Sequence, residues 1–419
     1  MNSEHGLTAD AENTGARILM VAGGTGGHIF PALAVAEELR ARGERAIPGY
    51  QIEFLGTHRP LEAKLIPAAG FRLRAVDAAG LKGIGGIQRL RNLLVLPRTM
   101  VDVAGILREF KPQVVVGVGG YLAGPVMLEA ALRDIPTILI EPNARPGFTN
   151  RLLAPLVRAA AVGFAETAHL YGEKARVTGH PVRRAFFDIP PRRPKASFTV
   201  LVVGGSQGSR AINQAVVESL PLLAREAGGV ADVAPGVSPA CADLKVGATS
   251  DAGLKPGATP VAAPKNEAFP GGIRIIHQTG ERDYNEVRKT YQERRLFAEV
   301  HAFIDDMPGA LSQADLVISR AGATAVAELA AAGRGALLIP FPGATDQHQL
   351  ENARAMEKAG AARVIVQSEL TPERLAGEIR ELMASPATLE RMETCARRLA
   401  RPDAAARIAD MVEAFARKS

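Results

Sequence analysis

The glycine-rich stretch Gly23-Gly24-Thr25-Gly26-Gly27-His28 is the feature that most limits how this chain can fold. It follows the apolar run Ile18–Ala22 and precedes the helix-like run Pro31–Leu39. Glycines let the backbone turn sharply and approach a ligand closely, and the following helix directs its positive end at the same point. We therefore expect a strand, a turn and a helix here, with an anionic group such as a phosphate bound at the turn.

The same arrangement recurs twice along the chain. Gly117–Gly120 follows the apolar run that begins at Val114, and Gly204–Gly208 follows Val200–Val203 and precedes a helix expected over 210–226. Neither the G-x-G-x-x-G dinucleotide fingerprint nor the Walker A motif fits any of these turns. Continuous apolar strands that alternate with helices are typical of buried parallel sheets. The pattern predicts an α/β protein with two doubly wound, Rossmann-like parallel-sheet domains facing each other across a cleft.

A length of 419 residues fits two domains of about 200 residues each. We expect a loose tail over 1–15 and a first domain made of 16–183 and 403–419. The second domain is expected over 184–402. A segment rich in Ala, Gly and Pro, 228–272, is expected to be a flexible insertion.

Composition excludes several classes of function. The net charge of +6 favours anionic partners, but only 5% of residues are aromatic and Trp is absent, so we expect no nucleic-acid partner. Cys241 and Cys395 form neither a disulfide framework nor a zinc cluster, and the histidines show no ligand spacing, so no metal site is expected. No run is long and apolar enough to cross a membrane.

Several polar residues are candidates for chemistry, each with an alternative. His28 could be a general base or could orient the turn. Arg183 could grip a phosphate or lie on the surface. Glu328 could accept both ribose hydroxyls, and Gln349 and Asn352 could bind sugar hydroxyls or lie on a solvated helix face.

The segment Lys82–Arg98 interleaves apolar and basic residues at helical spacing. This pattern suits a helix that lies on an anionic membrane surface. An ordinary amphipathic helix packed on the core would show the same pattern.

Taken together, these blocks resemble the MurG family of peptidoglycan N-acetylglucosaminyltransferases, and the likeness extends over nearly everything from Arg17 onward. The blocks that carry it are Gly23-Gly24-Thr25-Gly26-Gly27-His28-Ile29-Phe30-Pro31, Gly117-Val118-Gly119-Gly120-Tyr121, Gly204-Gly205-Ser206-Gln207-Gly208, Phe303-Ile304-Asp305-Asp306-Met307, and Pro340-Phe341-Pro342 with Asp346-Gln347-His348-Gln349. Two positions depart from the family pattern, namely His180 in Gly179-His180-Pro181 and Pro142 in Ile140-Glu141-Pro142-Asn143.

The resemblance implies a GT-B fold and an inverting transfer of N-acetylglucosamine from UDP-N-acetylglucosamine. The acceptor it implies is the C4 hydroxyl of MurNAc in lipid I, the undecaprenyl-diphosphate-linked MurNAc-peptide, and the product is lipid II. It further implies a peripheral protein on the cytoplasmic face of the bacterial inner membrane, no cofactor, and departure of UDP without a metal. A UDP-N-acetylglucosamine 2-epimerase of the same fold and a non-catalytic sugar-nucleotide-binding protein remain alternatives.

The resemblance also assigns roles to particular residues. His28 becomes the candidate catalytic base, Arg183 and Ser206 would hold the diphosphate, and Glu328 would bind the ribose. Ile304 would bind the uracil through its backbone, and Gln349 the transferred sugar. The remaining residues expected at the substrates are Thr25, Gly26, Gly27, Asn143, Ala323, Thr324, Ala325, Val326 and Ala327.

Overall fold

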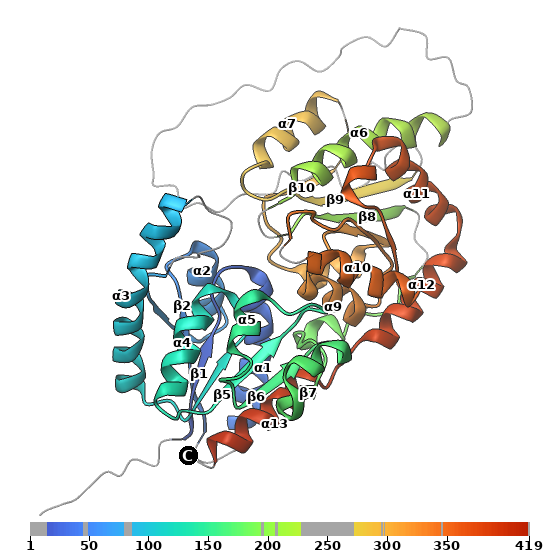
Figure 1. The fold of residues 1–419 in the computed structure, drawn as a ribbon. Helices are drawn as coiled ribbons and strands as arrows, with labels where there is room; N and C mark the ends of the chain where they lie inside the picture. The colour runs from blue at the N-terminus through green and yellow to red at the C-terminus, as the bar shows by residue number, and fades with distance from the viewer. Residues whose placement is uncertain are drawn as a thin grey trace, which may run out of the picture.

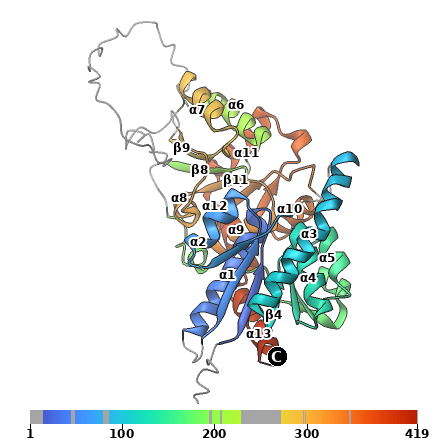
Figure 2. The ribbon, with the colours of Figure 1, turned by 90° about the vertical axis from the view of Figure 1, so that its left-hand side faces the viewer.

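A computed structural model describes 15–44, 49–78, 86–193, 197–205, 208–227, 272–294, 296, 298–344 and 347–417, without the side chains of 86–96 and 224–227. The tail expected over 1–15 and the insertion expected over 228–272 fall outside it, apart from Gly15 and Gly272. In the described chain two separate sheets form, and every strand pair in them is parallel. Figures 1 and 2 show the two α/β units side by side, which confirms the predicted fold class.

The first sheet has the strand order β3-β2-β1-β4-β5-β6-β7. Its strands are β1 (Arg17–Val21), β2 (Gln51–Gly56), β3 (Arg72–Ala75), β4 (Val114–Gly117), β5 (Thr137–Glu141), β6 (Ala159–Val162) and β7 (Ala175–Val177). In register, Val21 pairs with Leu55 on one side and with Gly117 on the other, so the carboxyl ends of three strands meet at one edge. Ligands of such sheets bind outside that edge.

Successive residues of β1 face opposite layers of helices. Ile18 and Met20 pack with α1 and α13, whereas Leu19 and Val21 pack with α3 and α4. The helices of this unit are α1 (Gly26–Gly43), α2 (Pro60–Ala68), α3 (Gly86–Phe110), α4 (Gly120–Leu132), α5 (Phe148–Leu153) and α13 (Ala404–Ala416). Because both faces of the sheet are covered, the central strands β1, from Ile18 onward, and β4 are apolar and buried, as the sequence pattern indicated.

The second sheet has the strand order β10-β9-β8-β11-β12-β13. Its strands are β8 (Phe198–Val203), β9 (Ile273–Gln278), β10 (Glu299–His301), β11 (Leu316–Ser319), β12 (Ala336–Leu338) and β13 (Ala362–Val364). Its helices are α6 (Arg210–Ala227), α7 (Tyr284–Glu293), α8 (Met307–Gln313), α9 (Ala323–Ala332), α10 (His348–Lys358), α11 (Pro372–Ala384) and α12 (Pro386–Leu399). Val200 and Leu201 again face opposite cores, so this sheet is doubly wound as well.

The chain returns to the first sheet after α12 (Figure 1). Helix α13 packs against α1 and β4, and it buries Ile408, Ala409 and Val412 in the core that also contains Ile18. The first sheet therefore depends on residues from distant parts of the sequence. The boundaries at 183/184 and 402/403 stay a prediction.

The amphipathic stretch Lys82–Arg98 falls mostly outside the described side chains. Helix α3 begins at Gly86, and its side chains are described from Pro97 onward. Its orientation toward core or solvent therefore stays a prediction.

Candidate active site

A large cleft lies between the two sheets, at the carboxyl ends of their strands. Its volume is about 1810 Å³, and both units contribute to its walls. Twelve of the residues predicted at the substrates line it: Thr25, Gly26, Gly27, His28, Asn143, Arg183, Ile304, Ala323, Thr324, Ala325, Glu328 and Gln349. Val326 and Ala327 do not, since their side chains pack in the core behind α9, and Ser206 lies outside the described residues.

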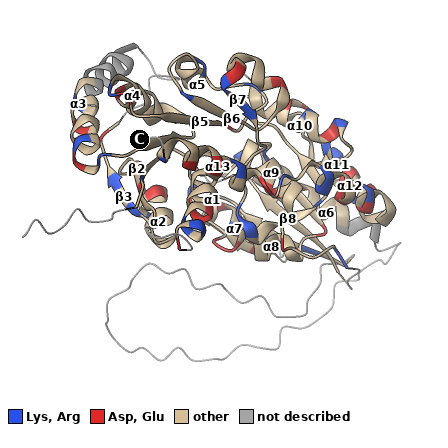
Figure 3. Ribbon diagram, turned by 90° about the horizontal axis from the view of Figure 1, so that it is seen from below, with Lys and Arg blue, Asp and Glu red and all other residues tan. Residues whose placement is uncertain are grey.

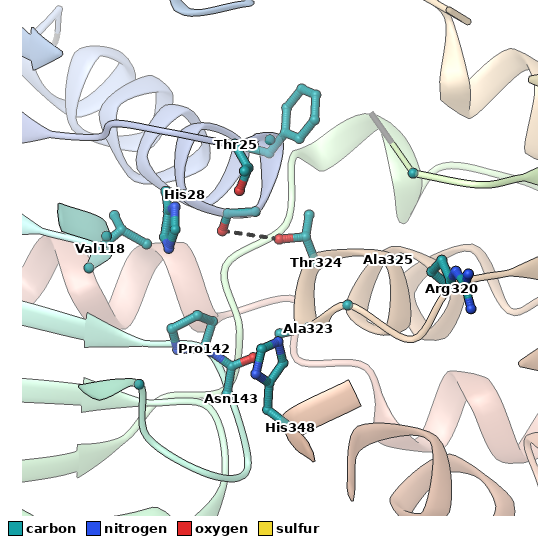
Figure 4. A pocket seen from close by; sticks show the side chains of 18 of the residues that line it. Thr25, His28, Val118, Pro142, Asn143, Arg320, Ala323, Thr324, Ala325 and His348 are labelled. Carbon is teal, nitrogen blue, oxygen red and sulfur yellow. Dashed lines mark hydrogen bonds between the residues drawn. The ribbon is translucent and has the colours of Figure 1, made fainter. Parts of the chain in front are cut away.

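His28 lies in the first turn of α1, with its ring against Gly120 and the glycine turn (Figure 4). A side chain at Gly120, where φ is +82°, would lie 2.9 Å from the Gly23 carbonyl oxygen, so the close approach requires glycine. Burial lowers the pKa of His28 to about 4; the Gly23 carbonyl opposes this shift and His348 adds to it. Its Nδ1 has no hydrogen-bond partner among the described residues. The imidazole is therefore neutral at pH 7 and retains a free lone pair.

The first glycine turn is held by a carboxylate that the sequence did not reveal. Glu62, fully buried at the start of α2, accepts hydrogen bonds from the Gly24 amide at 2.7 Å and from the Thr57 hydroxyl at 2.9 Å. It also accepts one from the Thr57 amide. The turn was expected to bind an external anion, yet the amide of Gly24 already binds the protein's own negative charge. The Gly24 amide is therefore not free to bind a phosphate, whereas the first amides of a helix such as α1 have no acceptor within the helix.

Asn143 is positioned by a second buried carboxylate, Glu141, at the end of β5. Glu141 accepts from the Asn143 amide at 2.9 Å, from the Asn143 side chain at 3.1 Å, from the Gly147 amide at 3.1 Å and from Asn150 at 2.8 Å. Burial raises the pKa of Glu141, and these hydrogen bonds oppose the shift. The loop after β5 is thereby held rigidly at the wall of the cleft, with Pro142 beside Asn143.

The second glycine turn is surrounded by cations and amides. Arg320, at the end of β11, donates to the Ser209 hydroxyl and to the Gln367 side chain, both at 2.7 Å, and to the Ile339 carbonyl at 3.0 Å. Burial lowers the pKa of Arg320 to about 10, so it stays charged at neutral pH. The sequence singled out the stretch that contains Arg320 but gave the arginine no role.

Ile304 shows an unexpected contact. Its amide, expected to help bind the uracil, donates to the Gln278 side-chain oxygen at 2.9 Å. The Gln278 side-chain nitrogen donates in turn to the Gly205 carbonyl at 3.1 Å. A uracil bound at Ile304 would therefore use the carbonyl of that residue or displace the glutamine.

The guanidinium of Arg183 lies against two aromatic rings. Its guanidinium carbon lies 4.9 Å from the ring centre of Phe30 and 5.1 Å from that of Phe186. Its Nε has no hydrogen-bond partner, and within the described chain it forms no ion pair, although it lines the cleft. Glu328 lines the same wall; burial raises its pKa to about 7, and the charge of Arg183 opposes this shift. Glu328 therefore changes its charge near neutral pH.

The two units also contact each other across the cleft. The Thr324 hydroxyl donates to the Gly27 carbonyl at 3.3 Å, which Figure 4 marks. The Ala144 amide donates to the Asn352 side-chain oxygen at 3.4 Å. Asn352 is fully buried and also donates to the Ala321 carbonyl, so the solvated-face interpretation of this residue was wrong. Gln349 lines the cleft, and its side-chain oxygen accepts from the Phe341 amide at 3.0 Å.

Neither a metal site nor a membrane span is found among the described residues. No group of three or more His, Cys, Asp and Glu side chains in them could hold a metal ion. None of the described helices combines the length and the apolar character that a membrane span requires.

Comparison with known proteins matches both halves of the chain to one enzyme family. Residues 18–162 match the glycosyltransferase family 28 N-terminal domain, and residues 199–408 match the glycosyltransferase family 28 C-terminal domain. A protein of Anaeromyxobacter sp. (strain Fw109-5) is 42% identical over 96% of this chain and 94% of its own length. A protein of Solibacter usitatus is 39% identical over 96% of this chain and 97% of its own length. Both relatives are named UDP-N-acetylglucosamine–N-acetylmuramyl-(pentapeptide) pyrophosphoryl-undecaprenol N-acetylglucosamine transferase.

Solved structures give the same picture. The crystal structure of Acinetobacter baumannii MurG is similar, with a TM-score of 0.65 and 28% identity over 95% of this chain and 99% of that one. A putative UDP-N-acetylglucosamine 2-epimerase from Listeria monocytogenes has a TM-score of 0.63, but only 12% identity over 97% of this chain and 98% of that one. The second likeness is one of fold alone.

Proposed function

The chain belongs to glycosyltransferase family 28, and we propose that it transfers N-acetylglucosamine from UDP-N-acetylglucosamine to the C4 hydroxyl of MurNAc in lipid I. The product is lipid II, the precursor used for peptidoglycan synthesis. The alternative of a 2-epimerase has only a likeness of fold in its favour.

The size and lining of the cleft carry this proposal. Pockets for a single small ligand usually have volumes of roughly 300–1,000 Å³. The cleft here measures about 1810 Å³ and is lined by a neutral histidine on one side and by Arg183, Arg320 and Glu328 toward the other. That space suits two substrates, a nucleotide sugar and a second diphosphate-linked sugar, better than it suits one.

The chemistry assigned to the first unit is proton removal. His28 accepts the proton of the acceptor hydroxyl while that oxygen forms a bond to C1 of N-acetylglucosamine. The bond from C1 to the UDP oxygen breaks in the same displacement, so the configuration at C1 inverts. The diphosphates of both substrates bring negative charge into the cleft, and this raises the pKa of His28 from about 4 toward the working pH.

The chemistry assigned to the second unit is binding of UDP and stabilisation of its charge as it departs. Glu328 accepts hydrogen bonds from the ribose hydroxyls, and Gln349 contacts the transferred sugar. Arg183, together with Ser206 and the N-terminus of α6, neutralises the leaving diphosphate. The aromatic rings beside Arg183 hold the guanidinium in place without neutralising it.

A peripheral place on the cytoplasmic face of the bacterial inner membrane fits the acceptor. Leu132, Phe148 and Leu152, on α4, at the start of α5 and within α5, are 71%, 52% and 60% exposed. Helices α4 and α5 pack together, and Arg133 and Arg151 lie beside these side chains in sequence. Elsewhere, as Figure 3 shows on α11 and α12, basic and acidic residues are interspersed. Replacing Leu132 and Leu152 by Ser should weaken sedimentation with anionic vesicles; unchanged sedimentation would exclude this face.

The test of the proposed function is acceptor dependence. Purified protein with UDP-N-acetylglucosamine should release UDP only when a lipid I analogue is present, and should then form the disaccharide. Release of UDP without acceptor, together with an epimerised sugar, would indicate the epimerase. Binding of the nucleotide sugar with no UDP release under either condition would indicate a non-catalytic binding protein.

A further inference from the structure

The side chain of Gln278 joins two segments that the proposed function uses for different parts of the donor. Gln278 is the last residue of β9, is 2% exposed and lines the cleft. Its nitrogen donates to the Gly205 carbonyl in the second glycine turn, and its oxygen accepts from the Ile304 amide. We propose that Gln278 is a positioning residue. It holds the second glycine turn (204–208, the diphosphate turn) and the loop between β10 and α8 that contains Ile304 (the uracil loop) at a fixed separation. This inference rests on the proposed function.

The backbone around Gln278 continues the same link. The Thr279 amide donates to the His301 carbonyl at 2.9 Å, and the Gly280 amide donates to the Ala302 carbonyl at 3.1 Å. The Gln278 side chain then pairs with Ile304, so the contact between β9 and the strand beside it extends past the last β10 residue into the loop. The uracil loop is thereby tied to the end of β9 at three successive points.

The opposite side of this segment faces the glycine turn and α6. Asn213 donates to the Thr279 carbonyl at 3.0 Å. A side chain at Gly208, where φ is +76°, would come within 2.1 Å of the same carbonyl oxygen, so the turn lies directly on this segment. The residues after β9 therefore lie between the two donor-binding segments.

A buried network keeps the end of β9 in place. His277, one residue before Gln278, is fully buried and contacts the Tyr291 hydroxyl at 2.9 Å and the Asn213 side-chain oxygen at 3.1 Å. Asn213 also donates to Asp283 at 3.2 Å. These contacts fix β9 against α6 and α7, so the backbone that carries the Gln278 side chain is held rigidly.

A side-chain amide satisfies both partners at once without a change of protonation. The Gly205 carbonyl, which also accepts from the Gly208 amide at 3.0 Å, takes a second hydrogen bond from a donor, whereas the Ile304 amide needs an acceptor. A carboxylate would keep the bond to Ile304 but place an oxygen against the Gly205 carbonyl. A leucine of similar size would lose both bonds while keeping the space filled. A ligand that contacts both segments should lose the most affinity when Gln278 no longer links them, because the two segments are then no longer held in the arrangement that fits the ligand.

The test is titration calorimetry of the full chain with UDP, uridine and inorganic pyrophosphate. Gln278→Leu should weaken UDP binding roughly tenfold, as expected for loss of one to two hydrogen bonds, while uridine and pyrophosphate each change by less than about threefold. In steady-state assays the donor KM should rise and kcat should stay near the wild-type value. The matched control is Gln214→Leu on the exposed face of α6, where the side chain bonds only to Glu218 at 3.0 Å; it should change nothing.

A second variant keeps the test decisive if Gln278→Leu folds poorly. Gln278→Glu should bind UDP weakly at pH 8 and regain affinity, relative to wild type at the same pH, as the pH falls to 5.5. A protonated carboxyl can again donate to Gly205, and burial favours the protonated form. The UDP affinity ratio of Gln278→Leu to wild type should stay constant over that range.

The outcomes separate the two proposals. If wild-type protein binds no UDP, the proposed function fails. If wild type binds UDP and Gln278→Leu matches it, or loses UDP and uridine affinity equally, Gln278 does not couple the two segments. A Gln278→Glu variant whose ratio to wild type is independent of pH would also overturn the role of Gln278 as a donor to Gly205.

Discussion

The first and second glycine turns occupy the same place in their units, between a central strand and a helix. Each turn is held by a side chain that lies at the end of the neighbouring strand or shortly after it. Glu62 follows β2, which pairs with β1, whereas Gln278 ends β9, which pairs with β8. The two side chains have opposite hydrogen-bonding roles toward their turns. Glu62 accepts from the Gly24 amide, whereas Gln278 donates to the Gly205 carbonyl.

This difference decides what each turn can bind. The carboxylate of Glu62 uses an amide donor of the first turn and brings its own negative charge, so the first turn is a poor phosphate site at Gly24 and a better place for His28. The amide of Gln278 binds a carbonyl of the second turn, so it occupies no N–H donor there and adds no negative charge near Arg320. Similar glycine turns thus acquire different chemistry from residues far away in the sequence.

The largest effect is expected from a substitution at His28. His28→Ala should lower kcat by roughly 10²–10⁴-fold and leave UDP affinity unchanged, since the first turn would supply the base and the second the nucleotide site. In the free protein, the NMR signal lost in this variant should report a neutral ring down to pH 5, because its pKa is about 4.

His58→Ala, which removes an exposed histidine outside the cleft, serves as the control and should behave as wild type. Near-normal turnover of His28→Ala would show that His28 is not the base. The two glycine turns would then not differ in the way proposed, with the base at the first turn and the nucleotide site at the second.

The next largest effect is expected from the brace of the first turn. Glu62→Gln would put a donor against one of the amides of Gly24 and Thr57, leaving a buried group unsatisfied. We expect the free energy of unfolding to fall by about 2–4 kcal/mol, measured by urea denaturation. Glu109→Gln, at an exposed ion pair with Arg74, should cost less than about 1 kcal/mol. Equal urea midpoints for the two variants would show that Glu62 does not brace the turn.

A smaller effect, confined to binding, is expected at Glu328. Ribose hydroxyls bind the ionised carboxylate, and the pKa of Glu328 is raised by burial to about 7. Affinity for uridine, which carries no phosphate, should therefore tighten as the pH rises from 6 to 8 and weaken as the carboxyl is protonated. Glu328→Gln should bind roughly 10–100-fold more weakly at pH 8 and lose this pH dependence, as measured by calorimetry.

Glu390→Gln, on the outer face of α12, should retain both the affinity and the pH dependence. A Glu328→Gln variant with the wild-type pH dependence would assign the titration to another group.

The smallest effect is expected where the two units meet. Thr324→Val removes one hydrogen bond, to the Gly27 carbonyl, and keeps the shape of the side chain. We expect kcat/KM to fall about two- to fivefold with both substrates, in line with one neutral hydrogen bond. Thr290→Val, on α7 away from the cleft, should have no effect. A loss above tenfold would mean that this contact does more than align the units.

The sequence was informative where structure is local. The apolar runs 18–22 and 200–203 correspond to β1 and β8, and the helix expected over 210–226 corresponds to α6, because apolar runs and glycine turns mark them. Strand β6 was not predicted, since its Ala159-Ala160-Ala161-Val162 has no β-branched or aromatic residue until its end. The edge strands β3, β7 and β10 were also missed; they have only 4, 3 and 3 residues.

At the site, the sequence pointed to the residues on the turns but not to those that hold them. Glu62 and Gln278 act through contacts with segments distant in sequence, and Glu141 acts through contacts within the loop that follows it. A buried carboxylate looks like a surface one in a sequence. One signal was available for Gln278. A glutamine at the end of a buried strand, just before Thr279 and Gly280, is unusual enough to be examined.

The return of the chain to the first sheet has a consequence for synthesis. Strands β8 to β13 and helices through α12 leave the ribosome before α13 does, so the second unit can complete its core first. Until α13 emerges, the first unit lacks the Ile408 and Val412 side chains that cover its core. The unit that contains His28 is therefore the last to be completed. A newly made chain would be able to bind the nucleotide before it could catalyse the transfer.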